Sequence, residues 1–257
     1  MKSAIVGICI TAIFLSLGCS TSSTSAIKPA DIAGKTDPTQ RAQIHTERAA
    51  EYYKLGRHAI ALEAVRQAIS AEPKYAPAYG MLALIHMELG ENDKAEAAFE
   101  QAIRLTQNDS DLLNNYGWFI CQRLDAKRSL NYFERAIKDP LYTTPERALY
   151  NAGVCAKRSS DLTAAQNYFS QSLKRNAQFA PSQFELAELA YVQMRFKDAD
   201  ALFSRFTGMV REQDAPSLLL GAKIARAMGD RNAEANYISQ LKRRFPDSTQ
   251  ARDASLR

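Results

Sequence analysis

The feature that most constrains this chain is a repeat of about 34 residues that begins near residue 42. Two related segments, Lys54-Leu55-Gly56 and Glu88-Leu89-Gly90, lie 34 residues apart, and Ala227-Met228-Gly229 is of the same kind. A small residue followed four positions later by an apolar one recurs at the same period, as in Ala95 and Phe99. Aligning on these positions predicts repeat starts near residues 42, 76, 110, 146, 180 and 215.

This pattern resembles the tetratricopeptide repeat, in which a first helix carries a small residue and a second helix carries Ala-x-x-x-Phe. Small residues let the two helices of a hairpin approach closely, and here they are Ala49, Ala83, Gly117, Gly153, Ala187 and Ala222. A lone hairpin cannot bury its apolar face, so hairpins must stack. Only 11 Gly and 9 Pro residues also argue against a β-sandwich or barrel. The sequence therefore predicts an all-α superhelix, an α-solenoid, of about six helix-turn-helix repeats spanning residues 42–249.

The N-terminus has the pattern of a bacterial lipoprotein signal. Lys2 is followed by a mostly apolar run from Ala4 to Leu17, which is shorter than the ~20 residues of a spanning helix. The run ends at Gly18-Cys19, which predicts a signal peptide at 1–18 and lipidation of Cys19. Ser16 stands where the lipoprotein pattern usually has Leu. The alternative is an ordinary signal peptide cut elsewhere, with Cys19 left as a free thiol.

The segments that flank the repeats are expected to lack a packed core. Residues 19–41 are polar and Ser/Thr-rich and contain Pro29, Gly34 and Pro38, which predicts a flexible tether. Its typical reach is about 25 Å, enough to hold the repeats near a membrane. Residues 250–257 are short and polar, and we expect this C-terminal tail to fray.

No catalytic or metal-binding constellation is recognisable. The three histidines, His45, His58 and His86, have no metal-ligand spacing, and His58 and His86 fall at helix-packing positions. No phosphate loop or nucleophile motif occurs. A net charge of +5 from residues scattered along the chain does not call for nucleic acid. We therefore expect no enzyme activity, no cofactor and no nucleic-acid partner. The run Lys242 to Arg244 is interpreted as a basic helix end, with contact to anionic lipid or peptidoglycan as the alternative.

The third repeat contains the only Trp of the chain, within Asn114-Asn115-Tyr116-Gly117-Trp118-Phe119-Ile120-Cys121-Gln122. A generic repeat needs neither this Trp nor the Asn pair before it. One interpretation is that Trp118 fills the core. The other places Trp118 on the concave face, because its position in the repeat is one that tetratricopeptide proteins use for ligand contact.

This segment, together with "YFERAIKDPLYTTPERALYNAGVCA" and the lipoprotein signal, resembles the type IV pilus biogenesis/stability lipoproteins, the PilF/PilW family. The resemblance covers essentially the whole chain. It implies a pilotin, which binds the pilus secretin subunit and promotes its localisation and multimerisation in the outer membrane, and hence twitching motility. It further implies a monomer on the periplasmic face of the outer membrane, held in the lipid by acylated Cys19.

Two other functions remain open on the sequence alone. Another tetratricopeptide lipoprotein, a scaffold for periplasmic cell-wall synthesis or protease complexes, would share every feature except the third- and fourth-repeat segments. A periplasmic enzyme is disfavoured by the missing active-site residues.

Repeat positions 5, 9 and 12 of the first helices line the concave side in proteins of this fold. Seven apolar side chains at these positions form the predicted partner-binding groove, although we expect at least two to be buried by neighbouring helices: Tyr53, Leu84, Met87, Trp118, Tyr150, Phe184 and Tyr191. Aromatic and Met side chains in a groove suit an apolar helix or extended segment of a partner.

Cys121 and Cys155 are the thiols that remain after signal removal and lipidation of Cys19. An even pair in an oxidising compartment is expected to form a disulfide. The two lie one repeat apart on neighbouring first helices, which places their Cα atoms within bridging reach where small residues meet. The alternative is a pair of buried free cysteines that act as small apolar core residues.

Overall fold

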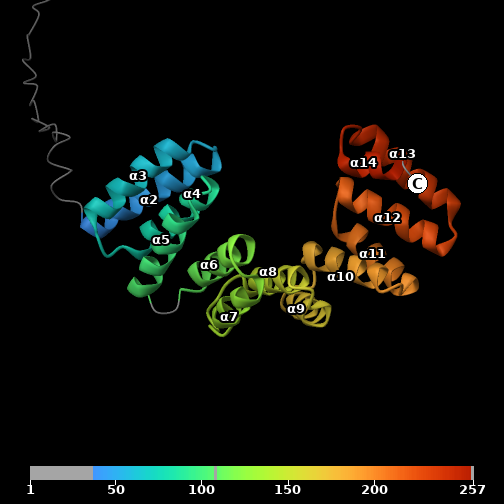
Figure 1. Ribbon diagram of the computed structural model, residues 1–257, viewed down its shortest axis with the longest axis horizontal. Helices are drawn as coiled ribbons and strands as arrows, with labels where there is room; N and C mark the ends of the chain where they lie inside the picture. The colour runs from blue at the N-terminus through green and yellow to red at the C-terminus, as the bar shows by residue number, and fades with distance from the viewer. Residues whose placement is uncertain (1–36, 107–108, 256–257) are drawn as a thin grey trace, which may run out of the picture. The chain divides into compact units, whose positions relative to one another are not determined.

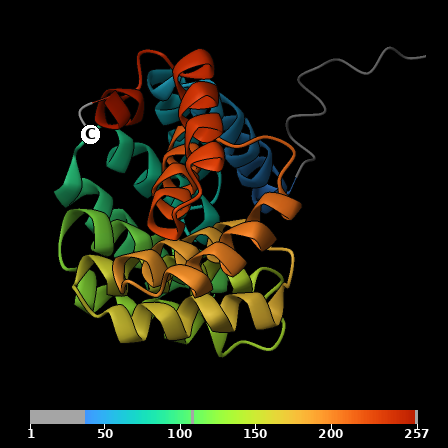
Figure 2. The same cartoon turned by 90° about the vertical axis from the view of Figure 1, so that its right-hand side faces the viewer.

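The computed structural model describes residues 37–106 and 109–255, and within these ranges every regular element is an α-helix. The predicted signal peptide, Cys19 and most of the predicted tether lie outside the described residues. Figure 1 labels the helices, and Figure 2 shows the same ribbon after a quarter turn. Twelve of the helices in the described ranges pair into six successive hairpins. Their helices are α2 (Pro38–Lys54) with α3 (His58–Ala71), α4 (Ala76–Glu88) with α5 (Asn92–Leu105), α6 (Ser110–Arg123) with α7 (Ala126–Ile137), α8 (Pro145–Arg158) with α9 (Leu162–Arg175), α10 (Ala180–Val192) with α11 (Phe196–Met209), and α12 (Ala215–Met228) with α13 (Arg231–Arg244).

The all-α tetratricopeptide superhelix is thus confirmed. The second helix of each hairpin packs on the first helix of the next, from α3 on α4 to α11 on α12. First helices also contact one another directly, as α4 does with α2 and α6. The buried residues form successive clusters along the stack, and partly buried side chains such as Trp118 and Tyr132 pack against two neighbouring clusters.

Local signals in the sequence fix the ends of these helices. Asp125 and Asp161 each accept a hydrogen bond from a backbone N–H in the first turn of α7 and α9. Prolines stand in the first turn of α8 and α10, where a missing N–H is tolerated. Gly90 follows α4 with φ of 73°, the left-handed conformation that closes a helix. The hairpin turns are therefore encoded residue by residue.

The hairpins interlock through the predicted pairing of small and large side chains. Phe133 and Phe169 are 0% exposed. Each ring lies against a glycine of its own hairpin, Phe133 against Gly117 and Phe169 against Gly153. This close approach of α6 to α7 and of α8 to α9 explains why the repeat places a small residue on the first helix.

Both ends of the repeat array differ from the sequence-based expectation. Helix α2 begins at Pro38, inside the segment predicted as tether to residue 41, because proline fits a first helical turn and Ala42 is fully buried. Within the tail predicted to fray at 250–257, residues 250–255 are instead helical as part of α14 (Thr249–Ser255). Ser248 Oγ accepts the Ala251 N–H, and Ala251 is buried with Leu218 and Leu241. Helix α14 packs on α12 and α13 and covers the last hairpin.

The third and fourth repeats are joined by a covalent link and a longer connection. A disulfide joins Cys121 of α6 to Cys155 of α8, with Cα atoms 5.8 Å apart, as the sequence predicts. The connection between α7 and α8 contains Tyr142, which is 9% exposed and packs in the same cluster as both cysteines. Its neighbour Leu141 is 84% exposed. The long junction is therefore anchored at Tyr142.

Candidate functional site

All seven side chains of the predicted groove come from first helices, α2, α4, α6, α8 and α10, and six of them are half-buried. Met87 is the exception and corrects the prediction. It is 9% exposed and lies in a core cluster with Phe99, Tyr116 and Phe119, because α6 packs over this part of α4. Met87 is therefore a core residue, and one groove residue is buried where at least two were expected.

Two pockets open along these first helices. The N-terminal pocket has a volume of about 220 Å³ and includes Leu84, and it is lined by Thr46, Ala76, Pro77, Gly80, Met81, Leu84, Asp109, Asp111, Leu112 and Asn115. The C-terminal pocket has a volume of about 390 Å³ and includes Tyr150 and Phe184, and it is lined by Tyr150, Ala180, Pro181, Phe184, Glu185, Phe206, Val210, Glu212, Asp214 and Pro216.

The two pockets occupy the same place in the repeat. Ala180 and Pro181 of the C-terminal pocket stand 104 residues, or three repeats, after Ala76 and Pro77 of the N-terminal pocket. Both pockets have an apolar floor and carboxylates at the start of the next first helix. Helix α6 of the third repeat, which contains Trp118, supplies Asp111, Leu112 and Asn115 to the N-terminal pocket.

Trp118 fits both interpretations that the sequence allows. Its side chain is half-buried and packs against two core clusters, one around Phe99 and one around the Cys121–Cys155 disulfide. The two Asn residues before it lie in different environments. Asn114 is buried and its Oδ1 accepts a hydrogen bond of 2.9 Å from Nδ2 of Asn151, which ties α6 to α8. Asn115 lines the N-terminal pocket.

Tyr53 and Tyr191 stand apart from both pockets. The Tyr53 hydroxyl donates to Glu88 Oε1 at 3.3 Å, and burial together with that carboxylate raises the pKa of Tyr53 to about 12. Tyr191 packs on Phe196 of α11, with ring centroids 5.7 Å apart. Of the seven predicted groove residues, Leu84, Tyr150 and Phe184 line the two pockets.

A cluster of charged residues beside the C-terminal pocket was not foreseen from the sequence. Lys157 Nζ of α8 donates to Glu185 Oε2 at 2.5 Å and to Glu188 Oε2 at 2.7 Å, both on α10. Burial raises the pKa of Glu185 above its ordinary value, although the hydrogen bond from Lys157 acts in the opposite direction. The Lys157 ammonium group thus pairs with two carboxylates, and the three side chains together carry a net negative charge.

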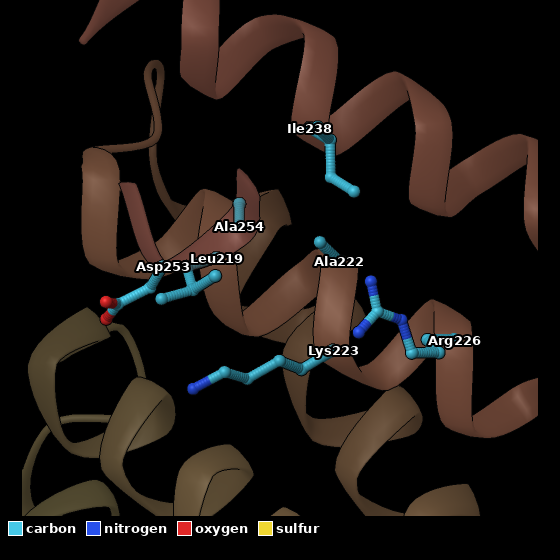
Figure 3. Close-up of a pocket in the computed structure, with 7 residues that line it drawn as sticks. All are labelled: Leu219, Ala222, Lys223, Arg226, Ile238, Asp253 and Ala254. Carbon is cyan, nitrogen blue, oxygen red and sulfur yellow. The ribbon is translucent and has the colours of Figure 1, made fainter. Parts of the chain in front are cut away.

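A third hollow lies between the last hairpin and α14. Its volume is about 40 Å³, room for little more than a water molecule, and Figure 3 shows Lys223 and Asp253 at one side of it and Arg226 at the other. Arg226 Nε donates to Glu234 Oε1 of α13 at 2.6 Å. This hollow is a by-product of the α14 packing and is small beside the two pockets.

Neither metal chemistry nor membrane crossing finds support in the part of the chain that the structure describes. There, no group of His, Cys, Asp and Glu residues is arranged to hold a metal ion, and no helix has the length and apolar character to span a bilayer. His86 Nδ1 lies 2.5 Å from Glu91 Oε2 across the turn between α4 and α5, so its role is to hold that turn.

Stacked hairpins with this interlocking of small and large residues define a tetratricopeptide repeat protein, and the family model described as "Tetratricopeptide repeat" matches residues 46–110. The chain is 34% identical to PilW, described as a widely conserved type IV pilus biogenesis factor. That crystal structure aligns over 83% of this chain and 98% of PilW, with a TM-score of 0.76. This chain belongs to the PilF/PilW family of tetratricopeptide proteins of type IV pilus biogenesis.

Two further matches agree with that assignment. The type IV pilus assembly protein PilF of Pseudomonas aeruginosa is 28% identical over 197 residues, which is 77% of this chain and 78% of PilF. A structure of Pseudomonas aeruginosa PilF aligns at 25% identity with a TM-score of 0.77, over 86% of this chain and 99% of that one. PilW and PilF are thus described as proteins of type IV pilus biogenesis and assembly.

Proposed function

We propose that this chain is an outer-membrane lipoprotein that binds the type IV pilus secretin subunit and promotes its localisation and multimerisation, and thereby twitching motility. The observation that supports this most is the alignment with PilW, a type IV pilus biogenesis factor, over 98% of that chain. The two pockets on the first helices supply protein-binding surface of the kind that a partner segment needs.

The proposed anchor is the acylated thiol of Cys19, followed by the Ser/Thr-rich segment. Three acyl chains bind a membrane far more strongly than the marginal hold of a single chain. Replacing Cys19 by Ser should therefore release the protein from the outer-membrane fraction. Wild-type amounts of the variant in that fraction would contradict the lipid anchor.

The function is tested by deleting the gene and following secretin multimers and surface pili. Both should disappear on deletion and return with the wild-type chain. Leu84→Glu and Trp118→Glu should fail to restore them while keeping the helical circular dichroism signal, because each places a carboxylate in the binding surface. The matched control is Ile60→Glu on the second helix α3, where the side chain is 45% exposed, and it should restore both.

Two outcomes would overturn parts of this proposal. Normal secretin multimers in the deletion strain would show that this chain does not promote secretin assembly. Full restoration by a folded double variant, Leu84→Glu with Trp118→Glu, would place the binding surface elsewhere on the chain.

A further inference from the structure

The C-terminal pocket combines an apolar floor with a rim of one charge. Phe184 of α10 and Phe206 of α11 form the floor with ring centroids 5.3 Å apart, and Tyr150 of α8 adds a third ring. Glu185, Glu212 and Asp214 supply its charged groups, and none of the ten described residues that line it is basic. At about 390 Å³ the pocket is within the ~300–1,000 Å³ range of ligand sites, so a large apolar side chain has room to enter.

The carboxylates of this rim are only partly neutralised by the protein itself. Lys157 is shared between Glu185 and Glu188. Glu212, whose side chain is 82% exposed, meets Arg244 at 3.1 Å, an exposed pair that water screens. Asp214 accepts the Ser217 N–H as the cap of α12.

The position of a carboxylate in the pocket also determines how strongly water screens its charge. The Glu185 side chain is 12% exposed and lies beside the aromatic floor, where water screens it poorly. Burial is the largest cause of the raised pKa of Glu185, because it disfavours the charged carboxylate. A further cation that approaches Glu185 would therefore stabilise this charged form. A ligand with positive charge next to an apolar group fits both features of the pocket at once.

We propose that the C-terminal pocket holds an apolar side chain of a partner protein segment, and that lysine or arginine residues flanking this side chain pair with Glu185, Glu212 and Asp214. The inference rests on the proposed function, because it names the chemistry of the segment that the first-helix surface binds. Opposite charges steer the segment to the pocket, and the aromatic floor holds the apolar side chain.

The N-terminal pocket provides an internal comparison. It has carboxylates at Asp109 and Asp111, but Gly80 stands at the repeat position that Phe184 occupies in the C-terminal pocket. Its volume is also smaller, about 220 Å³. It lacks the aromatic floor, and the apolar anchor of the segment therefore belongs to the C-terminal pocket.

The test uses the full chain purified in detergent and three short fluorescent peptides of Gly and Ser. Their centres are Lys-Phe-Lys, Glu-Phe-Glu and Lys-Ala-Lys, and fluorescence polarisation measures binding. The Lys-Phe-Lys peptide should bind at least about tenfold more tightly than either of the others, and added salt should weaken it. Equal affinities, or preference for the Glu-flanked peptide, would overturn the proposal.

Two variants localise the binding. Glu212→Lys reverses an exposed rim charge and should weaken binding of the Lys-Phe-Lys peptide about tenfold. Phe184→Ala removes part of the aromatic floor and should weaken binding of this peptide by a similar factor. The matched control is Glu100→Lys on α5, which also reverses an exposed carboxylate paired with an arginine, here Arg104 at 3.6 Å. Unchanged binding by Glu212→Lys, which leaves the core untouched, would place the site elsewhere.

Capture of the secretin subunit by the same preparation separates this inference from the proposed function. Secretin capture without any peptide preference would leave the function standing and overturn the inference. Peptide preference without secretin capture would support the pocket chemistry and contradict the proposed partner. Self-association that Phe184→Ala abolishes, with no peptide preference, would assign the pocket to a second copy of the chain and also overturn the inference.

Discussion

The ring of Phe169 lies directly against the backbone of Gly153, where a Cβ atom would come within 2.5 Å of Cε1. Gly153→Ala should therefore force the ring or helix α8 to move, at a cost of about 1–3 kcal/mol from overpacking. The higher helix propensity of Ala offsets part of this, by about 1 kcal/mol. We expect a net loss in the free energy of unfolding, measured by urea denaturation.

Gly208 is the matched control for this substitution. It is also a helical glycine, in α11, but a Cβ atom there would meet nothing within 4 Å. Gly208→Ala should therefore stabilise the fold by about 0.5–1 kcal/mol through helix propensity alone. Equal effects at the two positions would show that the packing of Phe169 does not require a glycine.

Reduction of the Cys121–Cys155 disulfide should lower the free energy of unfolding. The bond closes a loop of 34 residues, and the chain-entropy model gives about 3.8 kcal/mol for a loop of that length, with measured values of about 2–4 kcal/mol being typical. Denaturation with and without a reductant measures the difference. The stability of a Cys121→Ala/Cys155→Ala chain should not change when the reductant is added. In the wild-type repeats, unfolded without reductant, thiol titration should find neither Cys121 nor Cys155 free.

Met194 occupies a left-handed backbone position after α10, with φ of 59°, where earlier repeats have Gly56 and Gly90. Its side chain is 74% exposed, so little packing is lost on removal. Met194→Gly should relieve the backbone strain and raise the free energy of unfolding by about 0.5–1 kcal/mol. The reverse exchange, Gly90→Met, should destabilise by a similar amount. A loss of stability in the Met194→Gly chain would refute the strain argument.

The repeats were predictable because their determinants are local and steric. A small residue and an aromatic one at fixed spacing, such as Gly117 and Phe133, specify how two helices of a hairpin pack. In the last hairpin a second small residue, Gly221, also lies against rings: a Cβ atom there would come within 2.8 Å of Phe203 of α11 and within 3.0 Å of Tyr237 of α13. Helix α14 was missed because its sequence is polar and only Ala251 reveals its buried side.

The candidate site was only partly predictable for a different reason. Repeat position identified Tyr150 and Phe184, because it fixes which side of a first helix a residue faces. It did not identify Phe206 and Val210, which reach the C-terminal pocket from α11 and the segment after it. Nor did it reveal the sharing of Lys157 by two carboxylates. Contacts of that kind depend on how one hairpin is placed on the next.

The pKa of Glu185 yields the last prediction. It lies above the ordinary value of 4.5, with burial as the largest cause, so the folded chain binds the Glu185 proton more tightly than the unfolded chain does. The stability that this provides is fully present below pH 4.5 and is lost as the pH rises through the folded value. Relative to wild type, Glu185→Gln should therefore gain stability as the pH rises through this range, as measured by urea denaturation.

Carboxyl NMR of Glu185 checks the same prediction directly. Its titration midpoint should lie above 4.5 and should rise further in Lys157→Met, because the hydrogen bond and charge of Lys157 favour the carboxylate. A midpoint at or below 4.5 would refute the effect of burial. The Lys-Phe-Lys peptide should lower the midpoint, because a second cation beside Glu185 stabilises its charged form in the same way that Lys157 does.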